Sequence, residues 1–197
     1  MAAKKGVFAD RAAKIFNMKT IKQQYQAILP QLKKDLGVIN TLAVPRMVKV
    51  VVSAGTGKKR DKKHNEFVAD RLAKITGQKP SPRQAKKSIA TFKLRQGEVV
   101  GQMVTLRGKR MDDFLTKLIN AAIPRTRDFK GLNRQAIDEI GNLTIGIKEH
   151  SIFPETADEE LKDVFGLAVT IVTTAKTKAA AETLFTLLGF PFKKVAK

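Results

Sequence analysis

Four segments of the chain alternate apolar and polar residues with a period of two, the pattern of β-strands that have one buried face. In the first segment, Val48, Val50 and Val52 fall on one face and Lys49 and Ser53 on the other. The four segments span residues 47–52, 99–107, 142–153 and 166–174. Strands of a fully covered parallel sheet are uniformly apolar, whereas alternation is typical of an antiparallel sheet. We therefore expect a mainly antiparallel sheet with one open face.

Between these strands, apolar residues recur every three or four positions, as they do on one side of an α-helix. The predicted helices span residues 18–36, 61–75, 111–122 and 179–188. Gly37, Gly77 and Pro124 are placed to end the first three helices, and Pro30 predicts a kink in the first helix or its division into two. The order of the elements indicates an α+β fold with the helices packed on one face of the sheet.

The length of 197 residues fits one domain. We expect a single α+β domain over residues 18–192, a basic extension over residues 1–17 and a basic tail over residues 193–197. No stretch approaches the ~20 apolar residues that a membrane-spanning helix needs, so we expect a cytoplasmic protein with no membrane partner. Because residues 1–17 resemble a weak organellar transit peptide, an organellar protein is the alternative.

The distribution of charge narrows the class of partner. The chain carries 38 Lys and Arg against 18 Asp and Glu, a formal net charge of +20. Residues 41–100 hold 15 basic and 4 acidic side chains, a net charge of +11, whereas residues 151–197 hold 6 of each and are neutral. A polyanion is the natural partner of such a chain, and we expect residues 41–100 to bind most of it.

Two regions suit the phosphates and sugars of a nucleic acid. One is the open face of the predicted sheet, with the candidate residues Lys49, Ser53, Thr105, Arg107, Thr144 and Lys148. The other is residues 79–97, which we expect to form a long basic loop because Pro80 and Pro82 precede a run of Lys and Arg.

The neutral C-terminal quarter contains an acidic cluster, which consists of Glu155, Asp158, Glu159, Glu160 and Asp163. One interpretation is a solvated turn or the acidic first turn of a helix, where negative charge is favourable. The other is a patch that contacts a basic protein, because such a patch repels nucleic acid.

A glycine-rich segment, Gly55-Thr56-Gly57-Lys58, follows the first predicted strand, as a nucleotide-binding loop would. A P-loop requires a glycine where this chain has Val52 and a Ser or Thr where it has Lys59. A dinucleotide-binding fingerprint requires its third glycine where the chain has Arg60. The spacing therefore excludes both kinds of nucleotide site.

No catalytic constellation, cofactor site or metal site emerges from the sequence. The chain has no cysteine and only two histidines, which excludes thiol chemistry and Cys-containing zinc sites. Helix capping explains the paired carboxylates Asp112 and Asp113. Two alternatives stay open, an enzyme that processes nucleic acid with these carboxylates and a divalent ion, and a nonspecific basic packaging protein. The favoured interpretation is a non-enzymatic protein that binds RNA through charge and backbone contacts.

Several blocks of residues, in the same order, resemble the L5 family of large-subunit ribosomal proteins. The first run is Ile75-Thr76-Gly77-Gln78-Lys79-Pro80, which is followed by Ala85-Lys86-Lys87-Ser88-Ile89-Ala90 and Phe92-Lys93-Leu94-Arg95. Further blocks are Val104-Thr105-Leu106-Arg107-Gly108, Pro124-Arg125 with Arg127-Asp128-Phe129, Gly146-Ile147-Lys148-Glu149, Ile152-Phe153-Pro154-Glu155 and Val172-Thr173-Thr174-Ala175. The resemblance covers residues 18–192.

The resemblance implies a non-enzymatic protein that attaches 5S rRNA in the central protuberance, contacts P-site tRNA and forms a bridge to a small-subunit head protein. It implies further contacts with 23S-type rRNA and with neighbouring large-subunit proteins. For 5S rRNA, the family's contacts correspond to Gln78 and Thr105, and we add their sheet-face companions Lys49, Ser53 and Arg107.

For tRNA, the family's mobile loop corresponds to residues 83–95, with the candidate contacts Arg83, Lys86, Lys87, Ser88, Lys93 and Arg95. For the bridge, the resemblance points to residues 141–155, with the candidates Asn142, Lys148, Glu149 and Glu155.

The chain also departs from the family's usual pattern. Ser53 stands where the family usually has Asn, which shortens a polar side chain on the open face. Thr91 stands in place of a glycine in the loop and stiffens its tip. Leu143 replaces a common Tyr, and residues 1–17 exceed the usual start of the family.

Overall fold

Five strands form one antiparallel sheet in the order β2-β3-β1-β5-β4. The computed structural model describes residues 20–57, 59, 61–127, 129–156 and 163–193. The strands are β1 (Met47–Gly55), β2 (Ser81–Gln84), β3 (Val99–Leu106), β4 (Leu143–Ile147) and β5 (Leu167–Thr173). The antiparallel sheet that the alternating pattern predicts is therefore confirmed.

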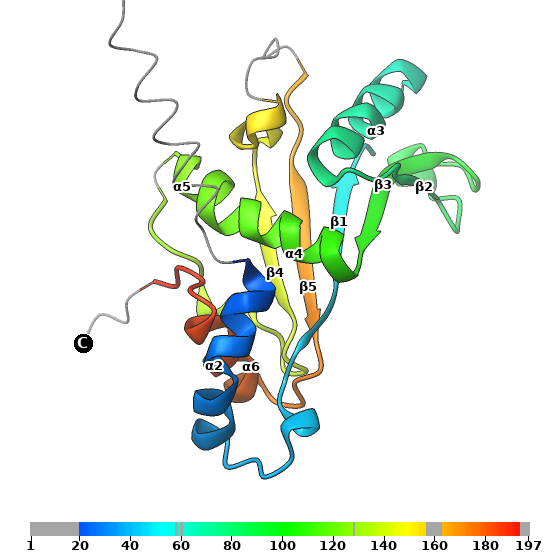
Figure 1. Cartoon of the computed structure of the whole chain (residues 1–197). Coiled ribbons are helices and arrows are strands. Elements are labelled where there is room, and N and C mark those ends of the chain that lie inside the picture. Colours follow the sequence, from blue (N-terminus) through cyan, green and yellow to red (C-terminus); the bar gives the residue numbers. More distant parts are fainter. Residues whose placement is uncertain (1–19, 58, 60, 128, 157–162, 194–197) are drawn as a thin grey trace, which may run out of the picture.

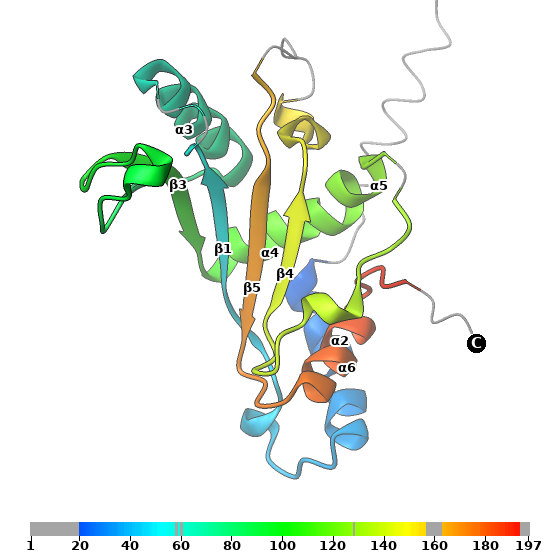
Figure 2. The ribbon, with the colours of Figure 1, turned by 180° about the vertical axis from the view of Figure 1, so that it is seen from behind.

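The helices pack against one face of this sheet, and the opposite face of β1, β5 and β4 is uncovered when the molecule is viewed from behind (Figures 1 and 2). The helices are α2 (Ile21–Asp35), α3 (Lys62–Thr76), α4 (Gly108–Lys117), α5 (Ile123–Arg125) and α6 (Lys178–Leu187). A π-helical turn, Leu118–Ala122, joins α4 to α5. None of the helices in these described ranges is long and apolar enough to cross a membrane.

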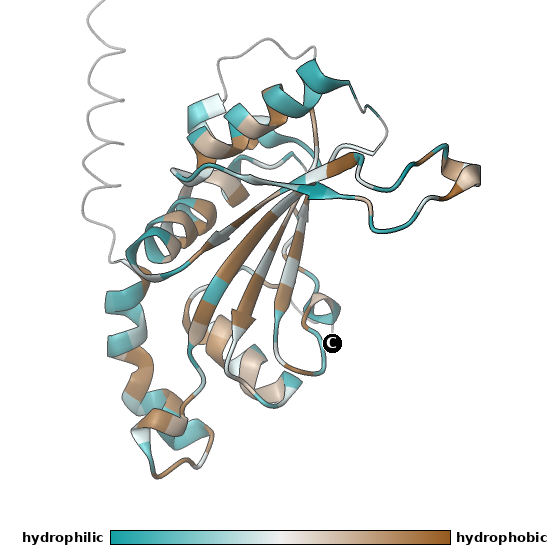
Figure 3. Cartoon of the chain, turned by 90° about the vertical axis from the view of Figure 1, so that its right-hand side faces the viewer, coloured by the Kyte–Doolittle hydropathy of each residue, from teal (hydrophilic) through white to brown (hydrophobic). Residues whose placement is uncertain are grey.

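The alternation of side chains along each strand separates the core from the open face. In β1, Val50, Val52 and Ala54 are buried under the helices, while Val51 and Ser53 between them are half-exposed. The same alternation holds in β5 and β4, and apolar colour follows the strands in Figure 3. Helix residues complete the core, and Leu32, Leu72, Leu115 and Phe185 are fully buried.

Local signals in the sequence set the ends of the helices. Thr20 and Gln23 form a reciprocal capping box at the start of α2. Gly37 and Gly77 follow α2 and α3 with φ of 63° and 68°, a conformation that glycine adopts without steric cost. Pro30 lies inside α2, which is one helix, so the expected division into two helices is wrong.

The predicted loop over residues 79–97 is wrong in part, because Ser81–Gln84 forms the edge strand β2 and pairs with β3. All four side chains of β2 are exposed, so the segment has no apolar alternation that a sequence pattern could detect. Pro82 is tolerated because an edge strand needs hydrogen bonds on one side only.

Other boundaries also differ from the prediction. β1 continues to Gly55, three residues beyond the end that the alternating pattern predicts. The predicted strand 142–153 ends at Ile147 and gives way to short turns at His150–Ile152 and Pro154–Thr156, because the chain folds inward to bury His150 and Phe153. Pro124 lies in the first turn of α5 instead of ending the helix, a position where no backbone N–H is needed.

Candidate nucleic-acid interface

The open face of the sheet carries two lateral rows of residues that cross four strands. Strand register places Thr105, Val51, Thr170 and Thr144 side by side in the first row. The hydroxyl oxygens of Thr144 and Thr170 lie 3.2 Å apart and share a hydrogen bond. Hydroxyls that both donate and accept can bind phosphate oxygens as well as ribose hydroxyls.

The second row is composed of Met103, Ser53, Ala168 and Gly146. Three of these four residues are small, so a partner can approach the sheet closely there. Gly146 is exposed, and a Cβ placed on it would meet no atom within 4 Å. The two rows together present four hydroxyls, two other small residues and the apolar side chains of Val51 and Met103, with no charged side chain among them.

The cations of this face lie at its margins. Lys49 is half-buried on β1 beside a register shift, Arg107 is exposed directly after β3, and Lys148 is exposed directly after β4. Of the six open-face candidates, Lys49, Ser53, Thr105 and Thr144 alternate with the core residues as the pattern predicts. A polar centre with basic margins can position an RNA backbone by contacts at its centre and neutralise phosphates at its edge.

Gln78 and Thr105 are 27 positions apart in the sequence and meet at the β3 edge of this face. The Gln78 side-chain amide donates a hydrogen bond to the Thr105 carbonyl oxygen at 3.4 Å. Arg110 donates from its guanidinium to Gln78 Oε1 at 3.5 Å. Ser81, the first residue of β2, pairs with Met103, so continuing this register places residue 79 opposite Thr105. Gln78 therefore lies next to Thr105, at a point where β3 has no neighbouring strand on this side among the described elements.

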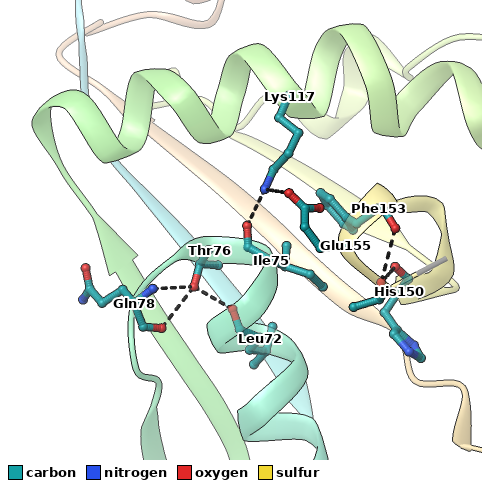
Figure 4. Close-up of polar contacts among 9 residues, drawn as sticks. Leu72, Ile75, Thr76, Gln78, Lys117, His150, Phe153 and Glu155 are labelled. Carbon is teal, nitrogen blue, oxygen red and sulfur yellow. Dashed lines mark hydrogen bonds and ion pairs between the residues drawn. The ribbon is translucent and has the colours of Figure 1, made fainter. Parts of the chain in front are cut away.

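Local hydrogen bonds hold the backbone of Gln78 in place (Figure 4). The Thr76 hydroxyl donates to the Leu72 carbonyl at 2.6 Å and accepts from the Gln78 backbone N–H at 3.4 Å. Lys117 donates to the Ile75 carbonyl at 2.6 Å, which satisfies one of the free carbonyls at the end of α3. The turn that presents Gln78 is thus tied to both α3 and α4.

Lys117 also forms an ion pair with Glu155 at 2.6 Å (Figure 4). Glu155 is one of the four candidate bridge residues, and its carboxylate faces its own chain. Asn142, a second candidate, accepts from the Thr173 backbone N–H at 3.2 Å and donates to Asp138 through its backbone and its side chain. Lys148 and Glu149 are exposed. Asn142 precedes β4 whereas Lys148 and Glu149 follow it, so the structure sets Asn142 at the opposite end of the strand from these two candidates. Two of the four candidates, Asn142 and Glu155, are engaged internally.

The Asp138 carboxylate accepts several hydrogen bonds from the residues that precede β4. Burial opposes its ionisation, but donors from Asn142, Gly141 and Ile140 together outweigh burial and lower the pKa of Asp138 below its usual value.

Residues 85–98 form an excursion between β2 and β3 that projects from the sheet (Figure 3). Backbone hydrogen bonds close its base, from Ala85 N–H to the Glu98 carbonyl and from Gly97 N–H to the Ala85 carbonyl. An antiparallel bridge between Ile89 and Leu94 closes its tip. All six candidate tRNA contacts are exposed along this segment and the strand before it, namely Arg83, Lys86, Lys87, Ser88, Lys93 and Arg95.

The tip of the excursion is apolar, since Phe92 is 66% exposed and Ile89 is 42% exposed. Lys93 has φ of 49°, an unusual conformation for a residue with a side chain. The Ser88 hydroxyl accepts a hydrogen bond from the Gln96 backbone N–H at 2.9 Å. The segment therefore has a defined hairpin shape with cations along both arms.

The carboxylates of the enzymatic alternative do not assemble a metal site in the described part of the chain, where no group of three or more His, Cys, Asp or Glu side chains gathers. Burial is the main cause that raises the pKa of Asp112, with Lys22 opposing it. Of the acidic cluster, Asp158, Glu159 and Glu160 lie outside the described residues, and Asp163 pairs with Lys59 at 3.1 Å. The extension 1–17 and tail residues 194–197 also lie outside them.

Sequence reasoning missed two residues that position the interface, Arg110 and Lys117. Both lie on α4, where their charges are typical of a solvated helix face. Arg110 falls three residues after Arg107 and, with Met111, continues the block of family resemblance at residues 104–108, so both signals could have linked it to the interface.

Two family models of known proteins match nearly all of the described fold. The family described as "Ribosomal protein L5" matches residues 40–95, and the family described as the C-terminus of the same ribosomal protein family matches residues 99–192. The chain is 48% identical over 169 residues to the large ribosomal subunit protein uL5 of Ureaplasma urealyticum, a match that covers 85% of this chain and 92% of the relative. It is 46% identical over 179 residues to the protein of the same name from Desulfatibacillum aliphaticivorans, covering 90% of this chain and 100% of the relative. The corresponding protein of Halothermothrix orenii is 45% identical over 179 residues, with the same coverage of both chains.

Proposed function

The chain belongs to the ribosomal protein L5 family, and from that premise we propose that its open sheet face binds 5S rRNA and attaches it in the central protuberance. Members of this family are structural proteins, so the chain is a structural constituent of the large ribosomal subunit and not an enzyme. Because its relatives are bacterial, we place it on cytoplasmic ribosomes.

The observation that carries the 5S rRNA proposal is the junction of Gln78 and Thr105 at the border of the open face. Arg110 and the Thr105 carbonyl hold the Gln78 amide, which fixes its position before RNA arrives. A preorganised amide loses little conformational entropy on binding, so it can contribute specificity at low cost. Ser53 and Thr105 would then contact the RNA from the face itself, and Lys49 and Arg107 would neutralise phosphates.

The excursion between β2 and β3 is suited to P-site tRNA. It extends away from the sheet, so it can reach a second RNA while the open face is occupied. Its cations lie on both arms, and Phe92 at the tip offers a ring for stacking on a base. Other basic surfaces of the chain would contact 23S-type rRNA and neighbouring large-subunit proteins.

For the bridge to a small-subunit head protein, we propose two roles for the four candidates. Lys148 and Glu149 are exposed after β4, so they would contact the partner. Glu155 is held by Lys117, and Asn142 is held by Thr173 at the opposite end of β4, so these two would stabilise the fold. One cation beside one carboxylate suits a partner of mixed charge.

The 5S rRNA proposal is tested by equilibrium binding of the purified chain to 5S rRNA and to a tRNA, titrated across salt concentration. We expect 5S rRNA to bind more tightly at moderate salt, and Gln78→Ala and Thr105→Ala to lose that preference by about five- to tenfold each, as for a hydrogen bond in a polar interface. The matched controls are Gln26→Ala on α2 and Thr186→Ala on α6, which replace exposed residues of the helical layer. Equal binding of both RNAs, with a common salt slope, would make the chain a nonspecific polyanion binder.

A further inference from the structure

A pocket of about 300 Å³ lies between the N-terminal half of α3 and the start of β3. α3 contributes one stripe of residues to it, spaced three and four positions apart, and Ala69 within that stripe leaves room for a guest. The residues that line the pocket are Lys62, Asn65, Glu66, Ala69, Glu98, Val99 and Gln102. We call it the Gln102 pocket.

Gln102 lines this pocket and carries a buried hydrogen-bond acceptor that is unpaired among the described residues. The residue is only 6% exposed, and its side-chain oxygen has no hydrogen-bond partner within the described part of the chain. Nearby, the Thr56 hydroxyl is also buried without a partner there, and strand pairing sets Thr56 beside Val100 and Ala54 beside Gln102. A buried acceptor without a donor costs about 1–3 kcal/mol, so this corner of the sheet favours a guest that donates hydrogen bonds.

The charges around the pocket indicate a cationic guest. Two carboxylates, Glu66 and Glu98, and one cation, Lys62, line it, so its lining has a net charge of −1 although the chain as a whole is strongly basic. Glu66 is exposed. In the described part of the chain it forms no ion pair with Lys62, which lies one helical turn before it. The net negative charge of the lining would repel an RNA phosphate and attract a cation that donates hydrogen bonds.

The walls of the pocket fit the stem of a long side chain. Val99 and the Ala69 methyl group offer apolar surface between the carboxylates and the Gln102 amide. Lys and Arg bury an aliphatic stem against such surface, and the arginine guanidinium carries five donors and no acceptor. Several acceptors in one pocket match the guanidinium better than the compact ammonium of lysine.

We propose that the Gln102 pocket binds an arginine side chain from a basic segment of a neighbouring protein. The guanidinium donates to the Gln102 side-chain oxygen and pairs with Glu66, and the stem lies along Val99 and Ala69. This site is separate from the RNA-binding face, because Gln102 alternates with Met103 and points to the helical side of the sheet.

The test is a titration of the ¹⁵N-labelled full chain with N-acetyl-arginine amide, followed by NMR at the Gln102 side-chain amide and the Ala69 backbone amide. The control ligand is N-acetyl-citrulline amide, which has nearly the same shape without the charge. We expect saturable shifts with the arginine compound and at least about threefold weaker binding of the citrulline compound, as the loss of a partly exposed ion pair would give. Absence of saturable shifts at Gln102 would overturn the proposal.

Three variants separate a specific site from general attraction of cations. Ala69→Leu fills the pocket and should abolish the shifts while the circular dichroism spectrum stays that of the parent. Glu66→Gln should weaken binding about three- to fivefold, the effect of one exposed charge pair. Asp70→Asn, on the same helix but outside the pocket lining, should change binding less than about twofold. Equal effects of Glu66→Gln and Asp70→Asn would show that the ligand responds only to net charge, which would contradict the proposal.

Discussion

The side-chain amide of Gln78 donates to the backbone carbonyl of Thr105 at 3.4 Å, so the end of α3 is joined to the open edge of β3. This contact links the helical layer to the face that we propose for 5S rRNA. Changes to the elements that support this junction, or to the charges around it, should therefore have measurable effects on stability and on RNA binding.

Lys117 should stabilise the turn that presents Gln78. Its ammonium donates to the Ile75 carbonyl and pairs with Glu155, both at 2.6 Å. We expect Lys117→Met to lower the free energy of unfolding by about 1.5–3 kcal/mol, the range for hydrogen bonds to charged groups. Urea denaturation measures this loss. Lys176→Met at an exposed position should change stability by less than about 0.5 kcal/mol, and an equally small effect of Lys117→Met would contradict the role.

Two strand glycines should respond differently to alanine. A Cβ on Gly101 would lie 2.9 Å from the Ala54 carbonyl oxygen, whereas a Cβ on Gly146 would meet nothing within 4 Å. Gly101→Ala should therefore cost about 1–3 kcal/mol, as overpacking does, because the two strands must separate. Gly146→Ala should be within about 0.5 kcal/mol of the parent. Thermal or urea unfolding of the pair measures both, and similar stabilities would show that the β1–β3 contact is looser than described.

Asp138 should make stability depend on pH at acidic values. Its pKa is lowered in the folded chain from the ordinary value of 3.8, so folding favours the ionised carboxylate. The stabilisation is complete above the unfolded pKa and is lost as pH falls below 3.8 through the folded pKa. Asp138→Asn should therefore flatten the decline of stability in this acidic window. The neighbouring substitution Glu139→Gln serves as the control, and an unchanged acid profile in Asp138→Asn would refute this assignment.

The charge of the excursion should set how strongly it binds tRNA. Lys86→Gln combined with Lys87→Gln removes two exposed cations from one arm. We expect the slope of log affinity against log salt to fall by up to about 1.8 for two phosphate contacts. Filter binding to tRNA at several salt concentrations measures the slope. The double variant Lys176→Gln and Lys178→Gln removes the same charge near α6, and an identical loss there would mean that tRNA binding is not localised to the excursion.

The sequence predicts most of the sheet because burial on one face leaves a visible period of two. Four of the five strands carry that period, and β2 does not, because its Ser, Pro, Arg and Gln side chains are all exposed. β4 is shorter than the predicted segment because the alternation stops at Ile147: Lys148 and Glu149 are both exposed, and His150 and Phe153 pack inward through turns. Periodicity identifies buried residues, but it does not distinguish a strand from a turn that buries the same side chains.

The sequence predicts which residues lie at the candidate site better than it predicts which of them contact one another. Alternation places Lys49, Ser53, Thr105 and Thr144 on the open face. The proximity of Gln78 to Thr105 depends on the register of β2, which the sequence does not reveal. Pairing of Glu155 with Lys117, and of Asn142 with Asp138, also depends on tertiary structure. Polar residues that a sequence pattern predicts to contact a partner can instead form contacts within their own chain.

The most direct test of the central claim is to find which face of the chain contacts 5S rRNA. Because the chain has no cysteine, a single introduced cysteine gives a unique attachment point for an iron-EDTA cleavage reagent. We predict strong, localised cleavage of bound 5S rRNA from Thr144→Cys and Thr170→Cys on the open face, and little from Gln26→Cys and Thr186→Cys on the helical layer. Cleavage from the helical positions that equals or exceeds cleavage from the open-face positions would contradict the account.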